Sequence, residues 1–106
     1  MKTNIIKIFF ILFLCSCSNY DLKVFEGKSF HLEDLKGKWI IFNYWADWCP
    51  PCIKEIPELN NLDKNFSKDL KVFLINFDLL EGEELKQQLE RFNVSVDSLL
   101  SDPSEI

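Results

Sequence analysis

Clusters of basic residues are missing from this 106-residue sequence, and negative charge dominates it. There are 12 Lys and Arg against 17 Asp and Glu, which gives a formal net charge of −5 at pH 7. A protein that binds nucleic acid needs a basic patch to neutralise phosphates, so the sequence predicts no nucleic-acid partner. The same lack excludes polybasic attachment to anionic lipid. The hydrophobic content of 47% is instead typical of one folded domain.

Histidine is also scarce, since His31 is the only one, and there are four cysteines. A structural zinc site built on a Cys-x-x-Cys pair needs two further ligands, usually a second such pair or two histidines. Beyond the N-terminal region the chain offers only Cys49, Cys52 and His31, so we predict no metal and no other cofactor. Copper or zinc delivery remains an alternative, which requires stoichiometric metal in dialysed protein. His31 is expected to be a turn residue without a catalytic role.

No apolar run is long enough to span a bilayer, which takes about 20 residues. The longest, Ile8 to Leu14, follows Lys7 and has the basic start and short apolar core of a secretory signal peptide. It is followed by Cys15-Ser16-Cys17, which resembles the end of the lipobox of bacterial lipoproteins. Ser16 suits the cleavage position, so Cys17 is the candidate for lipidation. A permanent membrane anchor, or two incidental cysteines in a signal peptide, are the alternatives.

The predicted organisation has three parts: a lipoprotein signal peptide at 1–16, a tether at 17–21 and a folded domain at 22–106. Acyl chains on Cys17 would attach the protein to the membrane. We therefore predict a location in the bacterial cell envelope, where disulfides persist. That leaves Cys49 and Cys52 as one redox pair rather than a disulfide scaffold.

Strand-like and helix-like segments alternate along the folded part of the chain. This order predicts parallel pairing through crossovers and hence an α/β fold, with the chemistry at the carboxyl ends of the strands. The tail at 97–106 has a weak pattern and is expected to end in a loop. The predicted segments are a small hairpin within 22–32, a buried central strand at 39–45, an amphipathic helix at 51–66 with a kink at Pro57, a strand at 70–77 and a helix at 81–92. The apolar stripe of the first helix is expected to consist of Ile53, Ile56, Leu59, Leu62 and Phe66.

Two cysteines separated by two residues at the start of a helix suit thiol–disulfide exchange. The reaction needs an attacking thiolate and a second thiol that resolves the mixed disulfide. A thiol with a pKa of ~8.5 is roughly 3% thiolate at pH 7, whereas a pKa of ~7 makes it about half ionised. The positive end of the helix dipole favours that anion. Cys49 is therefore predicted to attack and Cys52 to resolve, while Pro50 and Pro51 stiffen the first turn.

The segment from Trp39 to Pro57, WIIFNYWADWCPPCIKEIP, resembles the active-site region of the thioredoxin superfamily, in particular its TlpA/ResA-like envelope branch. The resemblance implies a thioredoxin-like fold, a central sheet with flanking helices. It also implies a thiol–disulfide oxidoreductase that reduces protein disulfides. Its partners would be protein thiols and disulfides, such as apocytochrome c or another envelope redox protein.

The resemblance also implies roles for single residues. Cys49 corresponds to the family's nucleophile and Cys52 to its resolving cysteine. Glu55 matches an acidic residue near the thiols in this branch. Asn43 replaces the buried aspartate of ordinary thioredoxins, and because an amide cannot titrate, Glu55 becomes the candidate proton carrier. A solvated helix residue is the alternative for Glu55.

Three neighbours of the cysteines are expected to matter for contacts. Trp48 is adjacent to the nucleophile and is predicted, with Pro50 and Pro51, to contact substrate. Trp45 is expected to fill the core at the end of the strand.

The resemblance extends from Leu22 to Phe92 and then stops. Members of the family continue into a cis-proline loop, an antiparallel hairpin and a closing helix, and we assign none of these to the last residues. Pro103 in particular is not expected to be that proline. We therefore expect a truncated product or a fragment, with an uncovered sheet edge. The alternative function is an inactive thioredoxin-like lipoprotein that serves only as a binding or remnant module.

Overall fold

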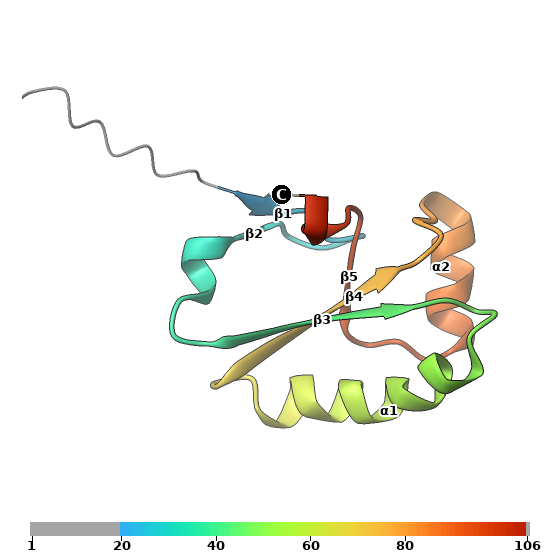
Figure 1. The fold of residues 1–106 in the computed structure, drawn as a ribbon, viewed down its shortest axis with the longest axis horizontal. Coiled ribbons are helices and arrows are strands. Elements are labelled where there is room, and N and C mark those ends of the chain that lie inside the picture. Colours follow the sequence, from blue (N-terminus) through green and yellow to red (C-terminus); the bar gives the residue numbers. More distant parts are fainter. Residues whose placement is uncertain (1–19, 106) are drawn as a thin grey trace, which may run out of the picture.

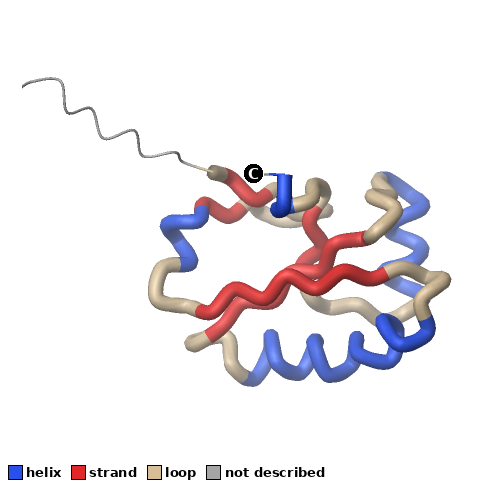
Figure 2. Tube along the Cα trace, in the orientation of Figure 1, coloured by secondary structure: helices blue, strands red, loops and turns tan. Residues whose placement is uncertain are grey.

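The computed structural model of the chain describes residues 20–105, and Figures 1 and 2 show its architecture. The predicted signal peptide, the lipidation candidate Cys17 and most of the predicted tether lie outside these residues, so they stay predictions. The elements are β1 (Asp21–Leu22), β2 (Phe30–His31), η2 (Leu32–Leu35), β3 (Trp39–Trp45), α1 (Pro50–Asn65), β4 (Leu70–Asn76), α2 (Gly82–Arg91), β5 (Asp97–Leu99) and η3 (Pro103–Glu105).

A three-stranded parallel sheet in the order β3-β4-β5 forms the centre of the fold. The first two of these strands are each followed by a crossover helix, β3 by α1 and β4 by α2, as the alternating sequence pattern predicts. The predicted α/β class, with a central sheet and flanking helices, is therefore confirmed. The predicted bounds of β3 match the structure. Those of β4 differ from it by one residue at one end, and those of the two helices by one residue at each end.

Two apolar clusters cover the two faces of this sheet. On one face, Val72 and Leu74 of β4 pack with Ile56 and Leu59 of α1. On the other face, Phe73 and its neighbours pack with residues of the N-terminal hairpin and η2. Figure 1 shows α1 on one side of the sheet and the β1–β2 pair on the other. This alternation of side chains along β4 explains why its interior residues are apolar without a break.

The position of β3 within the sheet differs from the prediction. We expected a buried central strand at 39–45, but β4 takes the centre and β3 lies at an edge. Within residues 20–105 the outer edge of β3 has no strand partner. Its side chains are accordingly less buried than those of β4, and Phe42 and Tyr44 are both exposed on one face. The prediction was wrong because an apolar run indicates burial of side chains but not the place of a strand in the sheet.

A short strand in the tail was also missed. No strand was predicted within 97–106, which was expected to end in a loop, but β5 forms there and pairs with β4 in parallel. Its other edge is covered by the segment around Val24, which forms an antiparallel bridge with Leu99. Phe25 N–H donates to the Ser98 carbonyl oxygen at 2.8 Å, and Leu100 N–H donates to the Lys23 carbonyl oxygen at 3.1 Å. Residues 97–99 therefore form a strand because distant segments pair with both of their edges, and not because of their own sequence.

Helix α1 presents its apolar stripe to the sheet, although the stripe ends earlier than predicted. Ile56 and Leu59 are buried, as expected. Phe66 was predicted to continue the stripe, but it is the C-cap residue and its side chain is half exposed. Pro57 lies inside the helix, which continues past it. In the part of the chain that the structure describes, no helix is long and apolar enough to cross a membrane.

Candidate functional site

The two cysteines meet at the start of α1, as predicted. Cys49 is the N-cap residue, and Pro50 and Pro51 occupy the first helical positions, where a missing N–H costs no helical hydrogen bond. The N–H of Ile53 donates to the carbonyl oxygen of Cys49 at 3.2 Å, which closes the first turn. The cysteine side chain therefore lies where the unpaired N–H groups of the helix concentrate partial positive charge.

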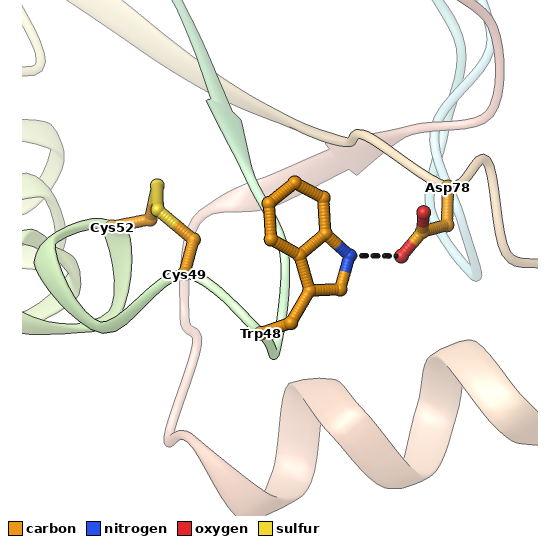
Figure 3. The surroundings of a disulfide bond; sticks show 4 residues. All are labelled: Trp48, Cys49, Cys52 and Asp78. Atoms are coloured by element: carbon orange, nitrogen blue, oxygen red, sulfur yellow. Dashed lines mark hydrogen bonds between the residues drawn. A yellow bond between two sulfur atoms is a disulfide. The ribbon is translucent and has the colours of Figure 1, made fainter.

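Cys49 and Cys52 form a disulfide, with their Cα atoms 5.3 Å apart (Figure 3). The two sulfurs differ in their surroundings. Cys52 packs against the core cluster that includes Trp45 and Ile56, whereas Cys49 precedes the helix and is not part of that cluster. The structure thus contains the oxidised form of the dithiol. Its second cysteine packs against the core, and its first lies outside the core cluster.

The sheet register explains what surrounds the disulfide. Trp45 pairs with Asn76, so β3 and β4 end side by side. The N–H of Phe77 donates to the carbonyl oxygen of Trp45 at 2.8 Å and extends the pairing by one residue. The residues that follow each strand therefore come together at the carboxyl edge of the sheet, where α/β folds place their chemistry.

A small apolar hollow of about 110 Å³ opens beside the disulfide. Trp45 forms part of its floor and is only 1% exposed, which confirms the predicted core role of this residue. The rim carries aromatic side chains that are exposed to solvent, chiefly Trp48 and Phe77. The lining residues are Tyr44, Trp45, Ala46, Trp48, Cys49, Cys52 and Phe77.

Trp48 lies next to Cys49 in the sequence, and its indole is held from two directions. Its Nε1–H donates to Oδ2 of Asp78 at 2.9 Å. Its ring meets that of Phe77 edge to face, with centroids 5.7 Å apart. Figure 3 shows the indole between the disulfide and Asp78. Trp48 is nevertheless 61% exposed, so it forms surface rather than core.

Asp78 and Phe77 were not predicted as site residues. They pair with Trp48 across about thirty positions of sequence, a contact that only the register of β3 and β4 makes visible. One signal was available, because Phe77 is the last residue of the strand predicted at 70–77 and Asp78 directly follows it. The carboxyl end of a strand next to the redox strand is where further site residues are expected.

Within the described residues, no hydrogen bond or ion pair connects Glu55, the predicted proton carrier, to the disulfide. Glu55 lies on α1 one turn after Cys52, and its side chain is exposed. Asn43 lies on β3 two residues before Trp45 and is half buried. Because side chains alternate along a strand, Asn43 shares the face of the sheet that Trp45 and α1 occupy. The proton-transfer role of Glu55 stays a prediction.

A second polar pair lies at the rim of the hollow. The hydroxyl of Tyr44 donates to Oδ1 of Asp102 at 2.5 Å, and the N–H of Ser104 donates to the same oxygen at 2.8 Å. The bond from Tyr44, followed by those from Ser104, holds the pKa of Asp102 below its usual value. The same bond raises the pKa of Tyr44, so its phenol keeps its proton. The pair ties the segment after β5 to β3.

His31 and Pro103 are not among the residues that line the hollow beside the disulfide. His31 is on β2, opposite Asp21 of β1, and its Nδ1 contacts Oδ1 of that aspartate. Pro103 begins η3, and none of the peptide bonds in the described part of the chain is cis. Residues 20–105 also contain no group of three or more His, Cys, Asp or Glu side chains placed to hold a metal ion.

Known proteins resemble this chain in sequence over its cysteine region. Thioredoxin-like protein YneN of Bacillus subtilis is 38% identical over 66 residues, which are 62% of this chain and 39% of YneN. Thiol-disulfide oxidoreductase ResA of Bacillus cereus is 38% identical over 84 residues, which are 74% of this chain and 48% of that protein. The chain therefore spans less than half the length of these curated relatives.

A solved structure resembles it in fold. The pneumococcal exposed lipoprotein thioredoxin of Streptococcus pneumoniae superposes with a TM-score of 0.65 at 22% identity, covering 83% of this chain and 69% of that one. At this identity the likeness establishes the fold alone. The AhpC/TSA family model matches residues 16–105, which is most of the sequence. This protein therefore belongs to the AhpC/TSA family.

Proposed function

We propose that this protein is a thiol–disulfide oxidoreductase that reduces protein disulfides through Cys49 and Cys52. The observation that carries the proposal is the Cys49–Cys52 disulfide at the N-terminus of α1, with an exposed aromatic rim around it. The name of its relative ResA, thiol-disulfide oxidoreductase, supports the same chemistry. No metal or organic cofactor takes part in the proposed reaction.

In the reduced protein the thiolate of Cys49 attacks one sulfur of a substrate disulfide. The substrate S–S bond breaks, a mixed disulfide forms with Cys49, and the leaving sulfur takes up a proton from solvent. Cys52, one turn further into α1, then loses its proton and attacks the Cys49 sulfur. The products are a substrate dithiol and the Cys49–Cys52 disulfide that the structure contains. Reduction of this disulfide by an external dithiol completes the cycle.

The site's surroundings fit these separate roles. Cys49 lies at the helix start, where the dipole stabilises a thiolate. Cys52 packs against the core, which suits a residue that attacks only its neighbour. Trp48 flanks the attacking sulfur and, with Pro50 and Pro51, forms the surface proposed to contact substrate. Glu55 is proposed to carry a proton to or from the thiols, acting from the next turn of α1.

The proposed location is the bacterial cell envelope, with a lipid anchor on Cys17. The support is the lipobox-like sequence before Cys17, together with the description of the pneumococcal neighbour as an exposed lipoprotein. Substrates there would be proteins with exported cysteines, apocytochrome c among them. Mass spectrometry of the mature N-terminus should find a diacylglyceryl group on Cys17, and an unmodified N-terminus elsewhere would contradict the anchor.

A second candidate is a binding module that keeps the cysteine pair but exchanges no disulfides. The outer edge of β3, which has no strand partner within the described residues, favours it, because an unpaired strand edge can bind an extended segment of another chain. One experiment separates the two candidates. Full-length reduced protein is mixed with insulin, and thiols on insulin are counted against the Cys49–Cys52 disulfide formed. Equal transfer is expected, whereas a dithiol that leaves insulin oxidised would support the binding module.

A further inference from the structure

The loop that follows β4 is built on a buried asparagine. Asn76 is 1% exposed, and its Oδ1 accepts hydrogen bonds from the N–H groups of Asp78 at 3.1 Å and Leu80 at 3.2 Å. The carbonyl oxygen of Asn76 also accepts a bond from the N–H of Leu79 at 3.0 Å. A side chain fixed in the core thus determines the path of the backbone that carries Asp78.

This loop delivers two groups to Trp48. Asp78 accepts the indole N–H, and Phe77 packs against the ring edge to face. An exposed side chain without such contacts exchanges rotamers within nanoseconds. The two contacts come from neighbouring residues of one loop and act on different parts of the indole, the nitrogen and the ring. Together they select one orientation of Trp48 beside Cys49, as Figure 3 shows.

We propose that Asp78 is a positioning residue for thiol–disulfide exchange, which holds the Trp48 indole beside Cys49 in the orientation that a docking protein disulfide requires. The role rests on the proposed function of the same site. Asp78 acts through Trp48 and does not itself take part in the exchange of bonds. Its loss is therefore expected to weaken docking of the substrate and to leave the chemical step unaltered.

The chain provides a matched control for the charge of Asp78. Asp47 is the residue directly before Trp48, is exposed, and carries the same charge. Within the described residues its carboxylate makes no hydrogen bond to the Trp48 indole, whose N–H goes to Asp78. Replacing either aspartate with alanine removes one negative charge near the disulfide. Only the change at Asp78 removes the hydrogen bond.

Insulin reduction by the full-length chain, with an external dithiol as reductant, is the first readout. Asp78→Ala is expected to raise KM about threefold to tenfold, the range for loss of one hydrogen bond, and to change kcat by less than about twofold. Asp78→Asn keeps an acceptor oxygen and should restore KM to within about twofold of the wild-type value. Asp47→Ala should match the wild type. A purely electrostatic role would instead give Asp78→Asn and Asp47→Ala the KM of Asp78→Ala.

Fluorine NMR of the chain labelled with 5-fluorotryptophan provides a readout that does not depend on activity. The Trp48 resonance is assigned from its loss in Trp48→Phe. Asp78→Ala should shift or broaden this signal and leave those of Trp39 and Trp45 in place. Asn76→Ala, which removes the acceptor beneath the loop, should disturb the same signal.

The outcomes separate this role from the function on which it rests. Wild-type protein that leaves insulin oxidised contradicts the proposed function. Active wild-type protein together with an Asp78→Ala variant of unchanged KM, or with an unchanged Trp48 resonance, contradicts only the positioning role. A fall in kcat at constant KM also contradicts it, because docking would then be intact.

Discussion

Replacing Cys49 by serine is expected to lower the rate of insulin reduction by at least about a thousandfold. The physical reason is the nucleophile, because a serine hydroxyl stays protonated at neutral pH and cannot open a disulfide. Loss of a nucleophile in other enzymes costs a factor of this size or larger. The measurement is the initial rate of insulin thiol formation, with external dithiol present and the uncatalysed rate subtracted.

The control is chosen to separate the loss of the nucleophile from a loss of structure. Cys49→Ser keeps an N-cap residue with a small polar side chain, so α1 should still begin at the same place. Its thermal unfolding should match that of wild-type protein kept in the reduced state. A Cys49→Ser protein that keeps one tenth of the wild-type rate would show that Cys52 can attack on its own. The assignment of roles to the two cysteines would then be wrong.

Replacing Phe73 by alanine is expected to lower the free energy of unfolding by about 3–5 kcal/mol, the range for a buried aromatic residue. Phe73 lies on the central strand β4 and is fully buried. Its ring contacts those of Phe30 and Phe42, with centroids 5.3 Å and 5.9 Å away. The substitution therefore leaves a cavity between the sheet and the N-terminal hairpin. A small domain has a total stability of roughly 5–15 kcal/mol, so much of it would be lost.

Urea unfolding at constant temperature measures this loss. Phe66→Ala is the matched control, because it deletes the same atoms from a side chain that is half exposed at the end of α1. The control should cost less than about 1 kcal/mol. Equal losses in the two variants would contradict the packing described for the face of the sheet opposite α1.

The redox centre could be predicted because its chemistry is local in sequence. Two cysteines, two prolines and a following amphipathic pattern lie within one stretch, and together they indicate a dithiol at a helix start. The structure has Cys49 as the N-cap residue and joins it to Cys52. The crossover helices and the strand β4 were predictable for a similar reason, since each is long enough to show its own periodicity.

The features that were missed depend on contacts between distant segments. Strand β5 is three residues long and exists because β4 and the segment around Val24 pair with its two edges. The edge position of β3 depends on the order of strands, which an apolar run does not encode. The bond from Trp48 to Asp78 requires the register that aligns Trp45 with Asn76. In each case the sequence indicates the element but not its partner.

The proposed division of roles, in which Cys49 attacks a protein disulfide and Cys52 resolves the product, can be tested with full-length Cys52→Ser protein. This variant can begin the reaction and cannot finish it. Reduced Cys52→Ser is mixed with insulin, quenched with acid, and digested, and mass spectrometry identifies the cysteine that is joined to insulin. A mixed disulfide on Cys49 is expected to accumulate, and an added dithiol should reduce it. Absence of this adduct, while Cys49→Ser protein forms one on Cys52, would show that the two roles are reversed.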